Sequence, residues 1–467
     1  MPRHHYLMAF VVIAASATAQ NSSAIQSAGP VQNATTSPKV TDSQDTSVPN
    51  QADLMNKLLE RVKELEARVA QLEALQAGIT PPVAAMTQVA TVQGPPAEGQ
   101  AAGQVSPSEP VVPAKAQTPS HDSAMAGMAG MGASTSASQD ATNYPNLHFR
   151  GFADVDFYAR DHKLGSSFFL GQFAIHMASQ LSPKIFYFGE FTMDATFGKQ
   201  FLVDLQRSFI RYDFNDNVKL SFGKFHTPIS FWNTAYHHGF WLQTSVFRPD
   251  VIQFGGTLIP VHFVGVQAEG KIPSGPLSPL GLQYNAIIGN GRGFDLSRGG
   301  ELIDANNNRA WAINIYSRPI HLDGFEVGGA TYHDLDNVKA KRYREFISSA
   351  HIAWTNETPE IIAEFFNINH RATDSAVEFN TQAFYVQGAY RLPFLQHQFK
   401  PYYRFEYTHT PRTEPVFGIQ DLVASSLGVR WDVSEFAAFK AEYRHSHNQS
   451  TFAPNVNNLF LQTAFTF

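Results

Sequence analysis

The stretch Leu459–Phe467, with the sequence LFLQTAFTF, decides how the rest of the chain is interpreted. Bulky or apolar residues occupy every second position, which is the period of a β-strand with two unlike faces. The chain then stops at Phe467. An exposed apolar edge strand invites aggregation, whereas the last strand of a closed barrel pairs with the first and leaves no edge. The stretch therefore predicts the closing strand of a barrel, and the alternative is an ordinary edge strand of a soluble sheet.

The composition agrees with a barrel. The 467 residues include 38 Phe and 16 Tyr and have a formal net charge of -6, yet the mean hydropathy is only -0.21. A bundle of membrane helices needs several long apolar runs, whereas a barrel dilutes its apolar residues with inward-facing polar ones. The weak charge bias does not suggest nucleic acid as a partner. Because the chain has no cysteine, disulfides and thiolate metal sites are excluded.

The N-terminus predicts export. Arg3 precedes an apolar run over Tyr6–Ala15, and Ala17-Thr18-Ala19 then matches an A-x-A cleavage pattern. Residues 1–19 are therefore predicted to be a secretory signal peptide that is removed on export. The alternative, an uncleaved membrane anchor, requires a longer apolar run.

Residues 51–79 predict a short coiled coil. Apolar residues recur at both core positions of a heptad, with Arg and Glu at the flanking positions where chains can pair. The Arg-core-core-Glu spacing resembles a trimer-favouring motif. We therefore expect a parallel periplasmic homotrimer, and the alternative is a lone amphipathic helix lying on the domain. The predicted trimerisation residues are Arg61, Val62, Leu65, Glu66, Arg68, Val69, Leu72 and Glu73.

The segments on either side of the coiled coil are polar and of low complexity. Residues 20–50 are predicted to be disordered, and residues 80–144 to form a flexible linker. Met125, Met128 and Met131 follow His121 in this linker, and thioethers at such spacing suit monovalent copper. We favour a linker that happens to contain Met, because no second cluster accompanies it. No cofactor and no metal are expected.

Residues 145–467 predict a barrel. About sixteen alternating segments are separated by turn residues, and single-chain bacterial outer-membrane barrels have an even number of strands. The predicted fold is all-β, a transmembrane antiparallel β-barrel of about 16 strands preceded by the short α-helical coiled coil. The expected strands are Leu147–Arg160, Ser166–Gln180, Lys184–Asp194, Val203–Phe214, Val218–Phe225, His262–Lys271, Leu282–Gly289, Ala310–Arg318, Phe325–His333, Glu345–Thr355, Ile361–His370, Gln382–Leu392, Lys400–His409, Leu422–Val433, Ala437–His445 and Leu459–Phe467.

The connections between these segments differ in length. Short turns mostly follow the even-numbered strands, and longer polar loops such as His333–Arg344 follow odd-numbered ones. Short periplasmic turns and longer external loops are typical of outer-membrane barrels. This pattern predicts that both termini lie in the periplasm.

Alternation along the later strands assigns their faces. Aromatic and aliphatic residues fall on one face, and charged residues fall on the other. A charged interior is costly in a soluble core but suits a water-filled channel. The residues predicted to face the lumen are Arg150, Arg207, Arg211, Arg404, Arg430, Lys440 and Arg444.

The longest connection, residues 226–261, is predicted to fold into the barrel and narrow it. Its many aromatic residues are too apolar to stand in solvent, and the barrel mouth is the nearest cover. The alternative is a loop that covers a neighbouring subunit. The predicted constriction residues are His226, Trp232, Tyr236, His237, His238, Trp241, Arg248 and Asp250.

One motif resembles a known family. The run Phe222–Pro228, which leads into Trp232-Asn233, resembles the Gly, basic or polar, Phe, x, Thr-Pro pattern of the phosphate-selective porin O and P family. The preceding Ser208–Tyr212 fits the strand that leads into it. An N-terminal coiled coil also looks like that of related trimeric channels for small organic anions. The resemblance implies a homotrimeric diffusion channel in the bacterial outer membrane.

The family name does not settle the solute. A phosphate channel should carry dense Lys and Arg at its constriction, but the long connection has no Lys, and Arg248 is its single Arg. The basic run Lys339–Arg344 is expected on an external loop, where it attracts anions or faces lipopolysaccharide. Aromatic residues at the constriction suit sugars or aromatic solutes. His237 and His238 would raise anion preference if they gained charge in mildly acidic water.

We therefore expect a passive outer-membrane porin for small hydrophilic solutes, among them anions such as phosphate. Sugars and organic acids are the alternative solutes. Expected partners are a homotrimer, outer-membrane lipid and lipopolysaccharide, and no nucleic acid. A structural tether with a plugged barrel is the rival from another class. An enzyme is not expected, because the sequence has no nucleophile motif and no metal constellation at ligand spacing. His333-Asp334 and His445-Ser446-His447 are expected to be surface residues.

Overall fold

The computed structural model describes residues 144–467 except 162–164, 196–200, 254–257, 294–303, 305, 339–340, 419 and 449–454. The predicted signal peptide, the coiled coil with its trimerisation residues and the Met-containing linker up to residue 143 lie outside the described residues.

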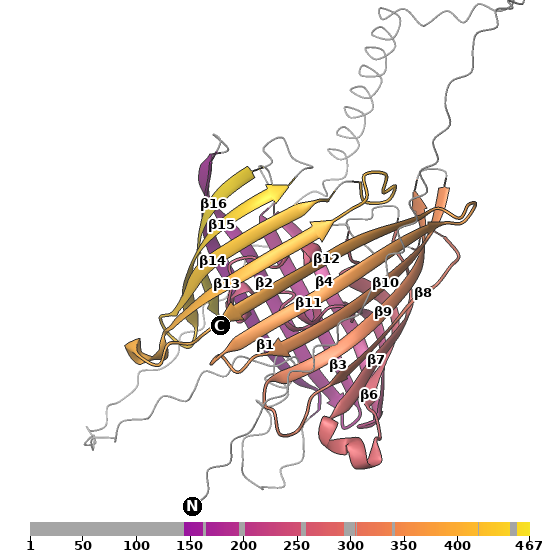
Figure 1. The fold of residues 1–467 in the computed structure, drawn as a ribbon. Helices are drawn as coiled ribbons and strands as arrows, with labels where there is room; N and C mark the ends of the chain where they lie inside the picture. The colour runs from indigo at the N-terminus through magenta and orange to yellow at the C-terminus, as the bar shows by residue number, and fades with distance from the viewer. Residues whose placement is uncertain are drawn as a thin grey trace, which may run out of the picture. The chain divides into compact units, whose positions relative to one another are not determined.

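Sixteen strands form one closed antiparallel barrel (Figure 1), as the sequence predicted. Each strand pairs with its neighbours in sequence, and β1 pairs with β16. The strands are β1 (Asn146–Arg160), β2 (Ser166–Ser182), β3 (Ile185–Ala195), β4 (Phe201–Asn215), β5 (Val218–His226), β6 (His262–Lys271), β7 (Leu282–Gly289), β8 (Ala310–Ser317), β9 (Phe325–Val338), β10 (Lys341–Trp354), β11 (Glu360–Ala372), β12 (Glu378–Ala389), β13 (Phe399–His409), β14 (Leu422–Asp432), β15 (Ala437–Asn448) and β16 (Asn455–Thr466).

The ladder between β1 and β16 closes the barrel. It runs from the pair Phe152 and Thr466 to the pair Arg160 and Asn458. Beyond it, the Gly151 N–H donates to the Phe467 carbonyl at 2.7 Å, and the Phe467 N–H donates back at 3.0 Å. The C-terminal stretch is therefore the closing strand, and the alternative of an edge strand in an open sheet is wrong.

The two faces of the later strands differ as the alternation predicted. On β13 the outward Tyr403 is 48% exposed, whereas the adjacent Arg404 is fully buried. On β15 the outward Tyr443 is 50% exposed, whereas Lys440 and Glu442 are buried. The outward apolar surface suits lipid, and the polar groups are gathered inside. Among the described residues, no helix is long and apolar enough to cross a membrane.

The predicted loop His333–Arg344 is wrong. β9 continues to Val338 and β10 begins at Lys341, so the two strands extend well beyond the predicted ends. Lys341–Arg344, the described part of the basic run, therefore belongs to β10 and not to a loop. These residues were predicted to form a loop because the inward-facing ones are acidic, and a run of polar residues is typical of loops.

Those inward acids are held by buried partners. Asp334, which was expected at the surface, is fully buried, and its Oδ2 accepts from the Arg292 N–H and the Tyr332 hydroxyl. Glu345 on β10 pairs with the Arg292 guanidinium at 2.9 Å, and His370 Nε2 lies 3.3 Å from the same carboxylate. An ionic network thus stabilises this end of the β9–β10 hairpin.

We predict that Gly223→Ala prevents the barrel from forming efficiently. Gly223 on β5 has φ 141°, and a Cβ there would lie 2.1 Å from the Ser208 carbonyl oxygen on β4. The disfavoured backbone alone costs about 1–3 kcal/mol, and the overlap adds to it. The measurement is the yield of heat-modifiable barrel on a cold gel after refolding into detergent.

Gly388→Ala on β12 is the matched control, because a Cβ at Gly388 meets no atom within 4 Å. Equal refolding yields for the two variants would contradict the prediction.

Candidate functional site

Between β5 and β6, the described residues of the segment 227–261, which are 227–253 and 258–261, lie inside the barrel. This segment, which we call the inner loop, contains α3 (Phe231–Ala235) and the short helices η1 (Phe240–Leu242) and η2 (Asp250–Ile252). Its two ends are joined where the Thr227 N–H donates to the Val261 carbonyl at 3.1 Å. η1 contacts β1 and β16, which are not adjacent to β5 and β6 in the barrel, so the loop reaches well beyond the strands that carry it. Most described residues of the inner loop are buried.

Glu364 on β11 holds the first part of the inner loop. Its carboxylate accepts hydrogen bonds from the Phe231 N–H at 2.8 Å and the Trp232 N–H at 3.0 Å. The Ser230 hydroxyl donates to it at 3.0 Å, and the Tyr385 hydroxyl of β12 donates at 2.6 Å. Hydrogen bonds to a charged acceptor are strong, so Glu364 fixes the start of α3.

Cations of β13–β15 hold the second part through its backbone carbonyls. Lys440 Nζ donates to the carbonyls of Phe240 and Ser245 at 2.5 and 3.0 Å. Arg430 donates to the carbonyls of Trp241 and Gln243, and Arg404 donates to the carbonyl of Phe247 and the Ser245 hydroxyl, at distances between 2.6 and 3.0 Å. Four of the residues named from sequence as lumen-facing lie inside the barrel, and all four donate to the loop: these three mainly through its backbone carbonyls.

The fourth, Arg444, binds the loop through a side chain. Its guanidinium pairs with Asp250 at 2.8 Å and with Glu406 at 2.7 Å. Burial raises the pKa of the Asp250 carboxyl above its usual value, although Arg444 opposes this shift. Arg248 donates to the carbonyls of His237 and Ile252, so it bonds within the loop. Burial lowers the pKa of the Arg248 guanidinium to about 9.

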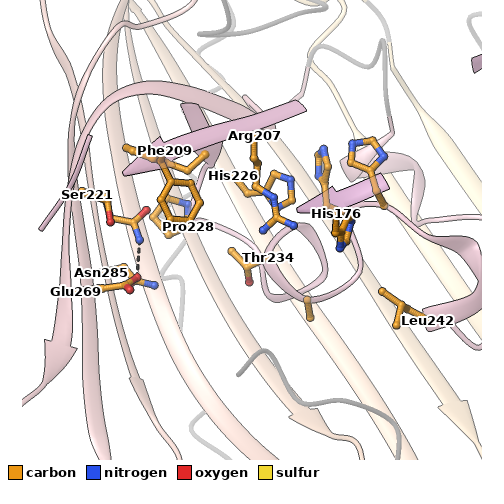
Figure 2. A pocket seen from close by; sticks show the side chains of 15 residues that line it. His176, Arg207, Phe209, Ser221, His226, Pro228, Thr234, Leu242, Glu269 and Asn285 are labelled. Atoms are coloured by element: carbon orange, nitrogen blue, oxygen red, sulfur yellow. Dashed lines mark hydrogen bonds between the residues drawn. The ribbon is translucent and has the colours of Figure 1, made fainter. Parts of the chain in front are cut away.

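A polar pocket lies on the other side of the inner loop (Figure 2), against the wall formed by β2 and β4–β7. Its empty volume is about 750 Å³, open solvent included. The wall contributes His176, Arg207, Ser221, Gln267, Glu269 and Asn285, and the loop contributes residues between Pro228 and Leu242. The cavity itself is about 70 Å³, and inward polar groups line it.

The charges at this pocket are paired locally. Arg207 contacts the Glu190 carboxylate, which also lies 2.7 Å from His176 Nε2. Farther along the same wall, Arg211 pairs with Asp213 at 2.7 Å and lies 3.4 Å from Glu269. The remaining predicted lumen residue, Arg150 on β1, donates to the Thr466 hydroxyl at 3.3 Å. The wall therefore carries both signs of charge and not a cluster of unpaired cations.

The inner-loop aromatic residues are mostly packed away. Trp232 and Tyr236 are 0% and 2% exposed, and their rings pack together at 5.1 Å between centroids. Trp241 is half-buried, and the guanidinium groups of Arg150 and Arg430 lie 5.4 and 5.6 Å from the centre of its ring. Of the predicted aromatic platforms, Trp232 and Tyr236 therefore have no ring face available for a sugar.

Four buried imidazoles meet at the base of the inner loop: His226, His237, His238 and His262. The sequence singled out the first three but missed His262, which pairs with His226 in the β5–β6 ladder. Burial lowers the pKa of both His237 and His238 well below the usual value. This direction is opposite to the one that the hypothesis of charging in mildly acidic water requires.

One of the comparisons with known proteins supports the fold. No family model matches the sequence, and no curated protein matches it. An anion-selective porin from Comamonas acidovorans is 8% identical and has a TM-score of 0.51, with 69% of this chain and 100% of that chain covered. The outer-membrane channel DcaP of Acinetobacter baumannii is 11% identical, with a TM-score of 0.49 over 71% of this chain and 100% of that one. The first similarity shows that the chain has the fold of an outer-membrane porin. It does not show membership of the phosphate-selective family.

We predict that Glu364→Ala releases the first part of the inner loop. The variant removes the acceptor of the Phe231 and Trp232 N–H groups. Each hydrogen bond to a charged group contributes about 1.5–3 kcal/mol, so amide exchange over residues 230–236 should accelerate roughly 10- to 100-fold. Hydrogen exchange followed by mass spectrometry measures this directly.

Glu378→Ala serves as the control, because Glu378 is exposed on β12 and pairs with the exposed Arg371. Unchanged exchange in Glu364→Ala, or equal acceleration in both variants, would show that Glu364 does not hold the loop.

Proposed function

We propose that the chain forms a passive diffusion channel of the bacterial outer membrane, narrowed by the inner loop, for small hydrophilic solutes. One observation carries the proposal: a polar pocket remains between the loop and the wall of β2 and β4–β7. The opposite wall is occupied, because its charged side chains bind the loop backbone. Solutes therefore pass on the pocket side.

The membrane setting follows from the surface of the barrel. Outward aromatic and aliphatic residues suit lipid and the lipid part of lipopolysaccharide. β1 begins at Asn146 and β16 ends at Thr466, and both positions lie at the barrel end where most connections are short turns. Short turns are typical of the periplasmic end, which supports a periplasmic location for both ends of the barrel domain. We retain the homotrimer, the signal peptide over residues 1–19, the linker segments and the coiled coil over 51–79 as parts of this proposal.

The paired charges favour weak ion selectivity over strong phosphate selectivity. Arg207 and Arg211 each contact a carboxylate, so neither offers an unopposed cation to a phosphate oxygen. Polar neutral groups such as Ser221, Gln267 and Asn285 line the same pocket and suit sugars or organic acids by hydrogen bonding. Phosphate remains the alternative that the family resemblance suggests.

A second function has its own support. The inner loop is fastened to β11, β13, β14 and β15 and reaches β1 and β16. A loop fixed so firmly also suits a plugged barrel that acts as a structural tether between the outer membrane and the cell wall.

Single-channel conductance in a planar bilayer, with the reversal potential in a salt gradient, tests both functions. We expect stable steps with weak selectivity that sugars or organic acids block. Anion preference, together with block of the channel by phosphate, would instead identify phosphate as the solute, as the family resemblance suggests. A folded, heat-modifiable barrel that gives no steps would leave the tether as the better account.

We predict that Gln267→Trp lowers the step size severalfold. Gln267 on β6 lines the pocket, and a larger side chain there narrows the path. Val266→Trp is the control, because Val266 directly precedes Gln267 and therefore faces outward. It pairs with Phe222, which is 50% exposed on the outer face. Equal conductance in the two variants would place the path elsewhere in the barrel.

We predict that deleting Leu54–Gln76 weakens trimer formation, because the deletion removes the heptad core positions. The measurement is the fraction of trimer on a semi-native gel. Trimers of undiminished stability after the deletion would assign the trimer contacts to the barrel alone.

A further inference from the structure

We propose that His226, His237, His238 and His262 form a binding site for a transition-metal dication such as Zn²⁺ at the base of the inner loop. The site does not depend on whether the barrel conducts, because metal binding is measured without ion flow. Each side chain offers one ring nitrogen, and these four atoms all lie within 4.8 Å of one another.

The four ligands come from three places in the chain. His226 ends β5, His262 begins β6, and the two residues face each other in the ladder. His237 and His238 follow α3 on the inner loop. The His237 ring centroid lies 3.8, 4.4 and 4.5 Å from those of His226, His238 and His262, so His237 is at the centre. An ion bound here would cross-link the loop to the barrel wall.

The spacing is close to that of a loaded site. Zinc binds imidazole nitrogen at about 2.0–2.1 Å, which places the nitrogens of a tetrahedral set about 3.4 Å apart. Small side-chain rotations bring nitrogens within 4.8 Å to that separation. Because all four ligands are imidazoles, the site suits Zn²⁺, Co²⁺, Ni²⁺ or Cu²⁺ and not Ca²⁺ or Mg²⁺, which prefer oxygen.

The hydrogen bonds around two of the rings fix the tautomer that metal binding needs. His237 Nδ1 lies 2.6 Å from the Asn233 side-chain oxygen, and His238 Nδ1 lies 2.8 Å from the Gln172 side-chain oxygen. An amide oxygen only accepts, so each Nδ1 donates and each neutral ring carries its lone pair on Nε2. Such outer partners orient metal-binding histidines in known sites.

His226 points to the same role. The residue is buried, yet neither ring nitrogen has a hydrogen-bond partner within the described part of the chain. A buried polar group without a hydrogen bond is costly, and a bound ion would compensate for it.

Charge and access also fit. The Glu190 carboxylate lies 3.7 Å from His226 Nε2 and offers negative charge beside the cluster, although it also contacts Arg207. Arg248, the cation nearest in sequence to the loop histidines, donates to backbone carbonyls. His226, His237 and His238 line the polar pocket, and Figure 2 shows His226 beside Arg207 on its wall. An ion can therefore reach the cluster through the pocket.

The test uses the full chain, purified in detergent, stripped with a chelator and dialysed. Zn²⁺ uptake is measured by equilibrium dialysis, and Co²⁺ is added separately to record its visible spectrum. We expect one tightly bound ion per chain and the intense absorption of tetrahedral cobalt. The weak absorption of octahedral cobalt, or no more Zn²⁺ uptake by the unaltered chain than by the variant that lacks the two strand ligands, would overturn the proposal.

The variant His226→Ala/His262→Ala removes the two strand ligands and should lower the affinity for Zn²⁺ by at least about 100-fold, since losing even an outer partner costs about 10- to 100-fold. The matched control is His445→Ala/His447→Ala, two histidines on β15 that each contact an Asn. The control should bind Zn²⁺ as tightly as the unaltered chain does. This result would show that the loss of any two histidines is not enough to weaken binding. Equal affinity in the two double variants would refute the site.

Gln172→Ala keeps all four ligands and removes the outer partner of His238. It should lower the affinity about 10- to 100-fold while retaining the tetrahedral cobalt spectrum. Each variant is first shown to be heat-modifiable on a gel, which separates loss of binding from loss of the fold. The cobalt spectrum of the unaltered chain decides the proposal even if a variant does not fold.

Discussion

The hydrogen-bonded ladder between β1 and β16 is the constraint on which the structure depends. In hydrocarbon every backbone N–H and C=O needs a partner within the protein, so a sheet can cross the bilayer only if it has no edge. The final hydrogen bonds between Gly151 and Phe467 complete this ladder. Closure fixes which residues face inward on all sixteen strands, and the inward set then determines what the barrel can contain.

The barrel interior has two unlike halves. The wall of β11 and β13–β15 uses Glu364, Arg404, Arg430 and Lys440 to bind peptide groups of the inner loop. The wall of β2 and β4–β7 keeps its polar groups around a pocket. This division reconciles a charged interior with a buried aromatic loop, because backbone groups of the loop satisfy most of the charges on one side. The pocket beside β2 and β4–β7 is therefore the part of the interior where solutes can bind or pass.

The sequence alone predicted the sixteen strands, because alternation with period two records the two faces directly. The prediction failed at the β9–β10 hairpin, where inward acidic residues such as Asp334 gave the sequence the polar character of a loop. The sequence could not show their buried partners, Arg292 among them. It located the inner loop by length but could not identify its anchors, since Glu364 lies 133 positions from Phe231 and Lys440 lies 200 from Phe240. His262 was missed for the same reason, because only the β5–β6 register brings it to His226.

The anchoring of the inner loop has a consequence for how such a chain can evolve. Most of the anchors bind peptide groups of the loop rather than its side chains. Every residue provides a peptide carbonyl, and every residue except proline provides an N–H group. Substitutions along the loop can therefore accumulate without loosening it, provided that the wall residues persist. The solute preference of the pocket can drift while the architecture stays constant, and a loop sequence alone would then be a poor guide to kinship.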